Sequence, residues 1–152
     1  MSGRGGGWVV AQFALIALCL VAVVIPPEWP SAARVPLAAV GAVLALAGAT
    51  VAVMASRTLG RGLTAYPRPV AGAPLVESGP YRIVRHPIYS GALLFFTGWS
   101  LFAGPVALAI TAALGILWVG KTAVEERYLR DAHREYAAYA SRVRRRLVPG
   151  VY

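Results

Sequence analysis

Long apolar runs without a single charged side chain set the first limit on how this chain can fold. The runs extend over 18 residues from Trp8 to Ile25, 21 residues from Val35 to Ala55, and 32 residues from Ile88 to Val119. A helix that spans a bilayer needs about 20 apolar residues. Only 14% of the residues are charged, against about 25% in soluble domains. The sequence therefore predicts an all-α integral membrane protein.

The third run is too long for one span, and it contains a break. Gly104-Pro105 in its middle predicts a turn between two helices. We therefore expect a single membrane domain, residues 1–152, with four transmembrane helices. They cover residues 8–25, 35–55, 88–102 and 105–120. A cleaved signal peptide is the alternative for the first run, because Arg4 precedes it and Ser31-Ala32-Ala33 could act as a cleavage site.

Positive charge is concentrated in the segments between and beside these spans. The net charge is +9, of which the loop at 56–87 carries +4, the tail from Lys121 onward +4, and Arg4 +1. With four spans, the N-terminus, this loop and the tail lie on one side of the membrane. The positive-inside rule makes that side the cytoplasm. The charge therefore predicts topology rather than nucleic-acid binding, and we expect a chain in a cell membrane with its N- and C-termini in the cytoplasm.

The tail is predicted to form a cytoplasmic amphipathic helix over residues 121–147. Apolar and aromatic residues recur there among charged ones at three- and four-residue spacings, and no Gly or Pro interrupts them before Pro149-Gly150. Arg142, Arg144, Arg145 and Arg146 close the helix and favour contact with anionic lipid headgroups. Because no stacking platform of aromatic and basic residues accompanies them, we do not expect nucleic acid as a partner.

A polar segment just before the third run carries residue types suited to chemistry. It reads Glu77-Ser-Gly-Pro-Tyr-Arg-Ile-Val-Arg-His-Pro-Ile-Tyr-Ser-Gly91. Pro87 suits the first turn of a helix. Backbone N–H groups there, together with Arg85 and His86, would bind a carboxylate or a phosphate. The alternative interpretation of the segment is an interfacial belt of Tyr and Arg.

Two adjacent carboxylates, Glu125 and Glu126, follow the fourth run. Adjacent helix positions point about 100° apart, so one carboxylate can face the bundle while the other faces water. A buried carboxylate near Arg85 and His86 would have partners. A solvated or capping role is the alternative for either glutamate.

Several common site types find no support in the sequence. Gly60-Arg61-Gly62 lacks the third glycine and the strand–helix context of a phosphate-binding loop. No Gly-x-Ser-x-Gly elbow occurs. His86 and His133 have no third metal ligand at helical spacing, and the single cysteine, Cys19, excludes a disulfide framework. We therefore expect neither a metal site nor a hydrolase.

Taken together, these residues resemble a family of integral-membrane methyltransferases that includes isoprenylcysteine carboxyl methyltransferase, with phospholipid N-methyltransferases as relatives. The resemblance runs from about Leu59 to the C-terminus. Its segments are Leu59-Gly60-Arg61, Leu75-Val76-Glu77-Ser78-Gly79-Pro80-Tyr81-Arg82, Arg85-His86-Pro87-Ile88-Tyr89-Ser90-Gly91, Glu125-Glu126 with Leu129, then Tyr136, Tyr139 and Leu147-Val148-Pro149. The Arg-His-Pro-x-Tyr-x-Gly core, joined to the Glu-Glu pair, is its most specific part.

The resemblance implies S-adenosylmethionine as the cofactor, bound between the cytoplasmic ends of the last two spans and the tail. The cofactor-binding residues that it implies are Tyr81, Arg85, His86, Pro87, Tyr89 and Gly91, followed by Glu125, Glu126 and Leu129. Arg85 and Glu126 are the expected catalytic residues. Two positions depart from the pattern: Lys121 stands where the eukaryotic relatives usually have Arg, and His133 stands where an aromatic residue is common.

The resemblance also implies a lipid-like or prenylated methyl acceptor, such as an isoprenylcysteine carboxylate, that enters from the bilayer. The first two runs carry little family signature and do not identify it. The alternative function is an NADPH-dependent membrane reductase of the sterol or steroid type, although the longer Asn- and Trp-rich motif of those enzymes is not seen. A non-catalytic membrane subunit is a third interpretation, against which the retained His86, Tyr89 and glutamate pair argue.

Overall fold

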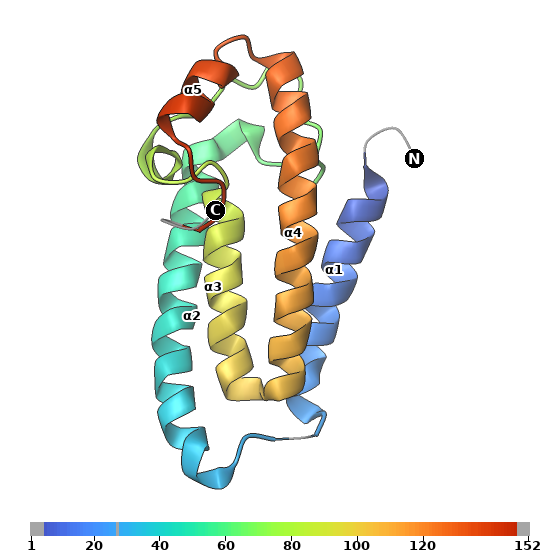
Figure 1. Ribbon diagram of the computed structural model, residues 1–152, viewed down its shortest axis with the longest axis vertical. Helices are drawn as coiled ribbons and strands as arrows, with labels where there is room; N and C mark the ends of the chain where they lie inside the picture. The colour runs from blue at the N-terminus through green and yellow to red at the C-terminus, as the bar shows by residue number, and fades with distance from the viewer. Residues whose placement is uncertain (1–4, 27, 149–152) are drawn as a thin grey trace.

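The structure is a computed structural model that describes residues 5–26 and 28–148, and these residues form helices and connecting loops only. The five α-helices are α1 (Gly6–Val21), α2 (Ser31–Leu59), α3 (Pro87–Ala103), α4 (Pro105–Ala132) and α5 (Tyr136–Arg142) (Figure 1). Arg4 and Pro149-Gly150, which entered the sequence predictions, lie outside the described residues.

Three of the helical segments are long and apolar enough to cross a membrane. They are Gly6–Val24, Ser31–Gly62 and Pro105–Ala132. The apolar helix α3 is shorter, with 17 residues. These segments confirm the predicted all-helical chain and indicate an integral membrane protein. The count of four spans stays a prediction.

The long helices pack in the spatial order α2, α3, α4, α1 (Figure 1). Glycines let the backbones of α2 and α3 approach closely. A Cβ atom added to Gly48 would lie 2.5 Å from the carbonyl oxygen of Gly91, and one added to Gly41 would lie 2.5 Å from that of Gly98. No larger residue fits such spacings, so these glycines hold α2 against α3.

The predicted break at Gly104-Pro105 separates α3 from α4. Gly104 has a φ of 133°, a backbone conformation that side chains with a Cβ rarely adopt. Pro105 begins α4, where its missing N–H costs no helical hydrogen bond. The two residues together make a tight hairpin, as the sequence predicted.

The predicted single amphipathic helix over 121–147 is wrong, because two helices and an irregular segment cover these residues. Helix α4 continues to Ala132, a break follows at His133, and α5 ends at Arg142. Residues 143–145 have no regular secondary structure, and residues 146–148 form a bend. Their carbonyl groups accept hydrogen bonds from the segment that precedes α3, and these tertiary bonds replace the bonds of a helix. The spacing of apolar residues in the tail does not indicate that its carbonyl groups have partners in the segment before α3.

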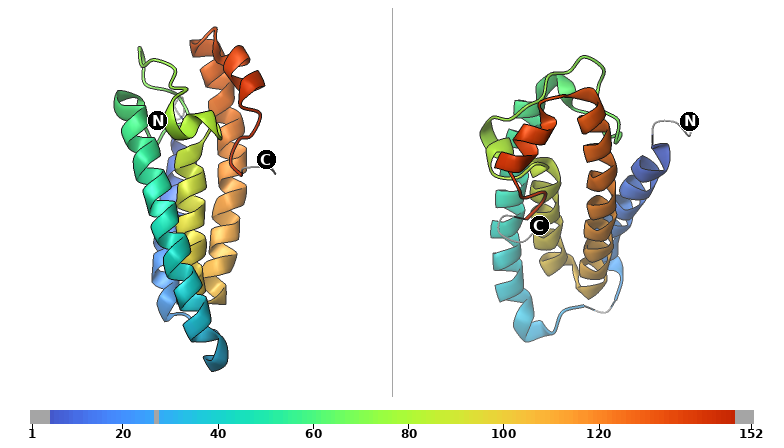
Figure 2. Two further views of the ribbon diagram at one scale, coloured as in Figure 1. Left: turned by 90° about the vertical axis from the view of Figure 1, so that its left-hand side faces the viewer. Right: turned by 45° about the horizontal axis from the view of Figure 1, so that its top comes forward.

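The loop between α2 and α3, helix α5 and the residues after it gather at one end of the molecule. The turn between α3 and α4 lies at the opposite end (Figures 1 and 2). The end that carries these segments also carries the polar residues singled out in the sequence. We therefore expect the functional site at this end of the molecule.

Candidate functional site

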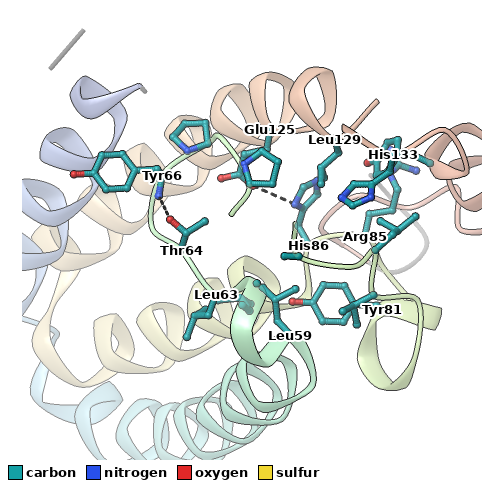
Figure 3. A pocket seen from close by; sticks show the side chains of 18 of the residues that line it. Leu59, Leu63, Thr64, Tyr66, Tyr81, Arg85, His86, Glu125, Leu129 and His133 are labelled. Carbon is teal, nitrogen blue, oxygen red and sulfur yellow. Dashed lines mark hydrogen bonds and ion pairs between the residues drawn. The ribbon is translucent and has the colours of Figure 1, made fainter. Parts of the chain in front are cut away.

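A cavity of about 350 Å³ lies at this end of the molecule (Figure 3). Its walls come from α1, the loop after α2, the starts of α3 and α5, and the last turns of α4. Six of the nine predicted cofactor residues line it: Tyr81, Arg85, His86, Tyr89, Glu125 and Leu129. The fold thus brings together side chains from two segments that are about 40 residues apart in sequence.

The other three predicted residues, Pro87, Gly91 and Glu126, do not line the cavity. Pro87 is the first residue of α3. Gly91 packs against α2, because a Cβ atom there would lie 2.5 Å from the backbone nitrogen of Ala52. Its position in the fold is therefore a helix-packing position.

Glu126 lies buried behind the cavity wall and gathers positive groups. Its Oε1 lies 2.8 Å from Arg85 Nε and 3.2 Å from Arg146 Nε. His86 Nε2 is 3.4 Å from the same oxygen. Arg130 Nη2 lies 3.6 Å from Oε2. These positively charged and hydrogen-bonding groups offset the cost of burying the Glu126 carboxylate, whose residue is fully buried.

Glu125 lines the cavity and makes a second polar centre. Tyr89 donates a hydrogen bond of 2.5 Å to Glu125 Oε1, and His86 Nδ1 lies 3.4 Å from Oε2. Burial lowers the pKa of His86, but the hydrogen-bonding contacts to Glu125 and Glu126 outweigh it and raise that pKa above its ordinary value. His86 therefore lies between the two carboxylates, and both favour its protonated form.

The segment after α5 docks directly on the site. The backbone N–H groups of Arg85 and His86 donate to the carbonyl oxygens of Arg145 and Arg146, both at 2.9 Å. Arg85 Nη1 donates to the carbonyl oxygen of Val143 at 2.7 Å. The terminal arginines were expected at lipid headgroups, whereas Arg146 pairs with Glu126. The tail is thus part of the site's framework.

Three buried polar atoms have no hydrogen-bond partner within the part of the chain that the structure describes. They are His86 Nε2, Glu126 Oε2 and the hydroxyl oxygen of Tyr136. Burial is the main reason why the pKa of Tyr136 lies above its ordinary value, so the phenol stays protonated and can donate a hydrogen bond. Both His86 and Tyr136 line the cavity. Unpaired buried polar groups are costly, and a bound ligand would supply their partners.

Part of this lining suits a cation, although Arg85 and His86 also line the cavity. Glu125 contributes a carboxylate, and Tyr81, Tyr89, Tyr136 and Tyr139 contribute aromatic rings. Aromatic faces attract a nearby cation. Among the described residues, no group of three or more His, Cys, Asp or Glu side chains is placed to hold a metal ion.

Sequence reasoning did not name every residue that the cavity brings together. Gln12 of α1 and the loop residues from Gly62 to Val76 were not candidates, although many of them line the cavity. Gln12 stands in the middle of an apolar run, and a polar residue inside a span is itself a functional signal. The loop residues that line the cavity are mostly Pro, Ala and Leu, and only the fold shows where they lie.

Comparison with known proteins gives a family match over most of the membrane region. The family model described as phospholipid methyltransferase matches residues 37–136. This range contains α3, α4 and all nine predicted cofactor residues. Helix α1 precedes it.

Two curated relatives match the chain over 72 residues. The cobalt-zinc-cadmium resistance protein CzcN of Cupriavidus metallidurans is 40% identical over 45% of this chain and 32% of its own length. Protein-S-isoprenylcysteine O-methyltransferase B of Arabidopsis thaliana is 36% identical over 45% of this chain and 36% of its own length. The match thus spans about a third of the length of each relative.

Proposed function

The chain belongs to the phospholipid methyltransferase family, and on that premise we propose that it is an S-adenosylmethionine-dependent methyltransferase acting on a lipid-like acceptor at the cytoplasmic face of a membrane. The family uses S-adenosylmethionine, which supplies a methyl group activated on a sulfonium. The observation that carries the proposal is the cavity that His86, Glu125 and five tyrosines line.

We assign the polar wall of this cavity to the cofactor. Glu125 and the tyrosine rings offer a negative, electron-rich surface to a sulfonium cation. The Tyr136 hydroxyl has no hydrogen-bond partner among the described residues, and His86 Nε2 has only the 3.4 Å contact to Glu126 Oε1, so both can bind polar groups of the cofactor. Leu129 adds apolar surface beside them. These residues fit the group in charge, in hydrogen-bonding capacity and in position.

In this proposal, Arg85 and Glu126 hold the residues of the site in their positions. Methyl transfer is an in-line displacement, so the alignment of the two reacting atoms supplies much of the acceleration. The Arg85–Glu126 contact joins the start of α3 to α4, and Arg85 also holds the tail through Val143. Arg85 lines the cavity and Glu126 supports it from behind. Glu126 is therefore a positioning residue.

The acceptor side of the cavity is apolar, which suits a lipid-like or prenylated molecule. The residues concerned are Leu59, Leu63, Pro74, Leu75, Val76 and Ile88. Such an acceptor would reach the site from the bilayer. The relative from Arabidopsis thaliana is named for an isoprenylcysteine, and this proposal includes acceptors of that class.

We propose further that α3 is a fourth span and that the N- and C-termini lie in the cytoplasm. The 17 residues of α3 rise about 26 Å, against a hydrocarbon core of about 30 Å, so its flanking residues would complete the crossing. The basic loop and tail then share one side of the membrane, as the positive-inside rule requires.

Calorimetry on the purified protein tests cofactor binding. The wild type should bind S-adenosylmethionine, and His86→Ala and Glu125→Ala should each weaken binding at least tenfold. Glu135→Ala is the matched control, because this glutamate is exposed and does not line the cavity. A wild-type protein that does not bind S-adenosylmethionine but binds NADPH would contradict the proposal. Transfer of labelled methyl into a membrane lipid extract, followed by mass spectrometry, then identifies the acceptor.

A further inference from the structure

Gln12 brings a hydrogen-bonding side chain into the cavity from outside the family match. It lies in α1, whereas the match begins at residue 37. Its side chain lines the cavity, and the residue is 8% exposed. Gln12 is also the only glutamine in the sequence, which contains no asparagine. A lone carboxamide in an apolar helix that reaches a ligand-sized cavity calls for a partner.

Two neighbours determine which way the carboxamide points. Trp118 Nε1 donates to Gln12 Oε1 at 3.0 Å, and Lys121 Nζ donates to the same oxygen at 2.7 Å. An indole N–H and an ammonium can only donate, so both require the carbonyl oxygen. The Nε2 group of Gln12 is therefore turned away from them, and its two N–H donors have no acceptor within the described chain.

The surroundings make this amide a strong donor for an anionic oxygen. Lys121 is fully buried, and it is the only lysine of the chain. Its Nζ donates to Oε1 and polarises the carboxamide, and hydrogen bonds linked in this way strengthen one another. Lys121 also donates to the carbonyl oxygen of Ala65 at 2.8 Å, which fixes the adjoining loop.

The position of Gln12 points to the methyl acceptor rather than to the cofactor. Lys121 joins the carboxamide to the backbone of Ala65 in the loop beside α1, and its Nζ also lies 3.9 Å from Glu125 Oε1. The carboxamide therefore lies between this loop and Glu125, where an acceptor would adjoin the cofactor. Figure 3 shows the neighbouring loop residues Thr64 and Tyr66 on one side of the cavity, with His86 and His133 on the other. The cofactor residues assigned above gather around His86.

We propose that Gln12, held by Trp118 and Lys121, donates an Nε2–H hydrogen bond to an anionic oxygen in the head group of the methyl acceptor. The oxygen is a carboxylate, as in a prenylated cysteine, or a phosphodiester, as in a phospholipid. Both share the chemistry that Gln12 recognises. This inference rests on the proposed methyltransferase function and names the contact that selects its acceptor.

Magnetic resonance tests the contact directly, because the protein labelled with ¹⁵N in glutamine has one side-chain NH₂ signal. Wild-type protein in detergent micelles is titrated with N-acetyl-S-farnesylcysteine and, separately, with a short-chain phosphatidylethanolamine, both without cofactor. The signal should move and saturate with at least one of the two, and the one that moves it identifies the source of the oxygen. No movement with either acceptor overturns the inference. A signal that moves in a separate titration with S-adenosylmethionine, but not with either acceptor, overturns it as well.

A pair of variants separates hydrogen-bond donation from a purely structural role. Gln12→Glu keeps an oxygen for Trp118 and Lys121 but presents a carboxylate oxygen to the cavity in place of N–H. Labelled-methyl transfer should show at least a tenfold higher KM for the acceptor, with kcat and the Kd of S-adenosylmethionine changed less than twofold. A merely structural Gln12 would be rescued by Glu, and wild-type kinetics in this variant would refute the inference.

Cys19→Ala is the matched control in α1. Cys19 Sγ lies 3.3 Å from Thr111 Oγ1 of α4, so this variant also removes a buried α1–α4 contact but leaves the cavity lining intact. It should keep the acceptor KM of the wild type. An equal rise of KM in both variants would mean that α1 acts only by packing, and would overturn the assignment. If the wild type does not bind S-adenosylmethionine, the proposed function is refuted. The resonance titration still tests the contact between Gln12 and the acceptor in that case.

Discussion

Arg85 Nε lies 2.8 Å from Glu126 Oε1, and the two side chains are 8% and 1% exposed. This contact joins the segment before α3 to α4 across 41 residues of sequence. The attraction between two buried charges is opposed by their desolvation, so such a pair persists only with further hydrogen bonds around it. Val143 and Arg146 supply them here. The pair thereby holds α3, α4 and the tail together around one cavity.

Breaking this pair on one side should destabilise the protein strongly. Glu126→Gln leaves Arg85 buried without its charged partner, and removal of one partner of a buried pair typically costs about 3–5 kcal/mol. The double variant Arg85→Met/Glu126→Leu should cost less than the two single changes together. Unfolding free energies in micelles, combined in a double-mutant cycle, measure the coupling. Arg142→Met is the control, because it breaks an exposed ion pair with Glu77, which is worth at most about 1 kcal/mol.

Stability should depend on pH through His86. Its folded-state pKa is raised, because its contacts to Glu125 and Glu126 outweigh the burial that lowers it. A raised pKa contributes stability that is fully present below the unfolded value of about 6.5, and that is lost as pH rises through the folded value. We expect the Tm difference between wild type and His86→Gln to shrink as pH rises. A constant difference in thermal unfolding from pH 5.5 upward would show that His86 does not gain this charge.

Gly91 should be important for helix packing more than for ligand contact. Gly91→Ala places a Cβ atom 2.5 Å from the backbone of Ala52 and 2.7 Å from the carbonyl oxygen of Gly48. Such overpacking costs about 1–3 kcal/mol. Gly7→Ala is the matched control, since nothing lies within 4 Å of the added atom. Unfolding measurements should separate the two variants, and equal stabilities would disprove the close approach of α2 and α3.

The tail should contribute to cofactor affinity. Deletion of residues 143–152 removes the carbonyl groups that accept from Arg85, His86 and Ser90. The segment carrying Arg85 and His86 then loses its anchor, and we expect the affinity for S-adenosylmethionine to fall at least tenfold in calorimetry. Ser90→Ala, which loses one of these bonds, should fall by less. If the truncated protein keeps its full affinity for S-adenosylmethionine, the tail does not support the site, and contact with lipid headgroups would be favoured instead.

Much of the site could be predicted from sequence because its residues stand in short local segments. Tyr81, Arg85, His86 and Tyr89 lie within nine positions of one another, and Glu125 and Leu129 lie one helical turn apart. All six meet at the cavity. The identity of the buried glutamate could not be predicted, because helical geometry distinguishes two faces without saying which face is covered.

The sequence by itself determined the long apolar helices, the hairpin at Gly104-Pro105 and the family. These properties depend on local hydropathy, local backbone preference and short motifs, all of which are written in consecutive residues. Only the tertiary structure decided that the tail leaves its helix after Arg142 to dock beside His86. It also decided that Gln12 lines the cavity and is held there by Lys121. Both depend on partners 60 or more residues away, and no local pattern specifies a partner at that distance.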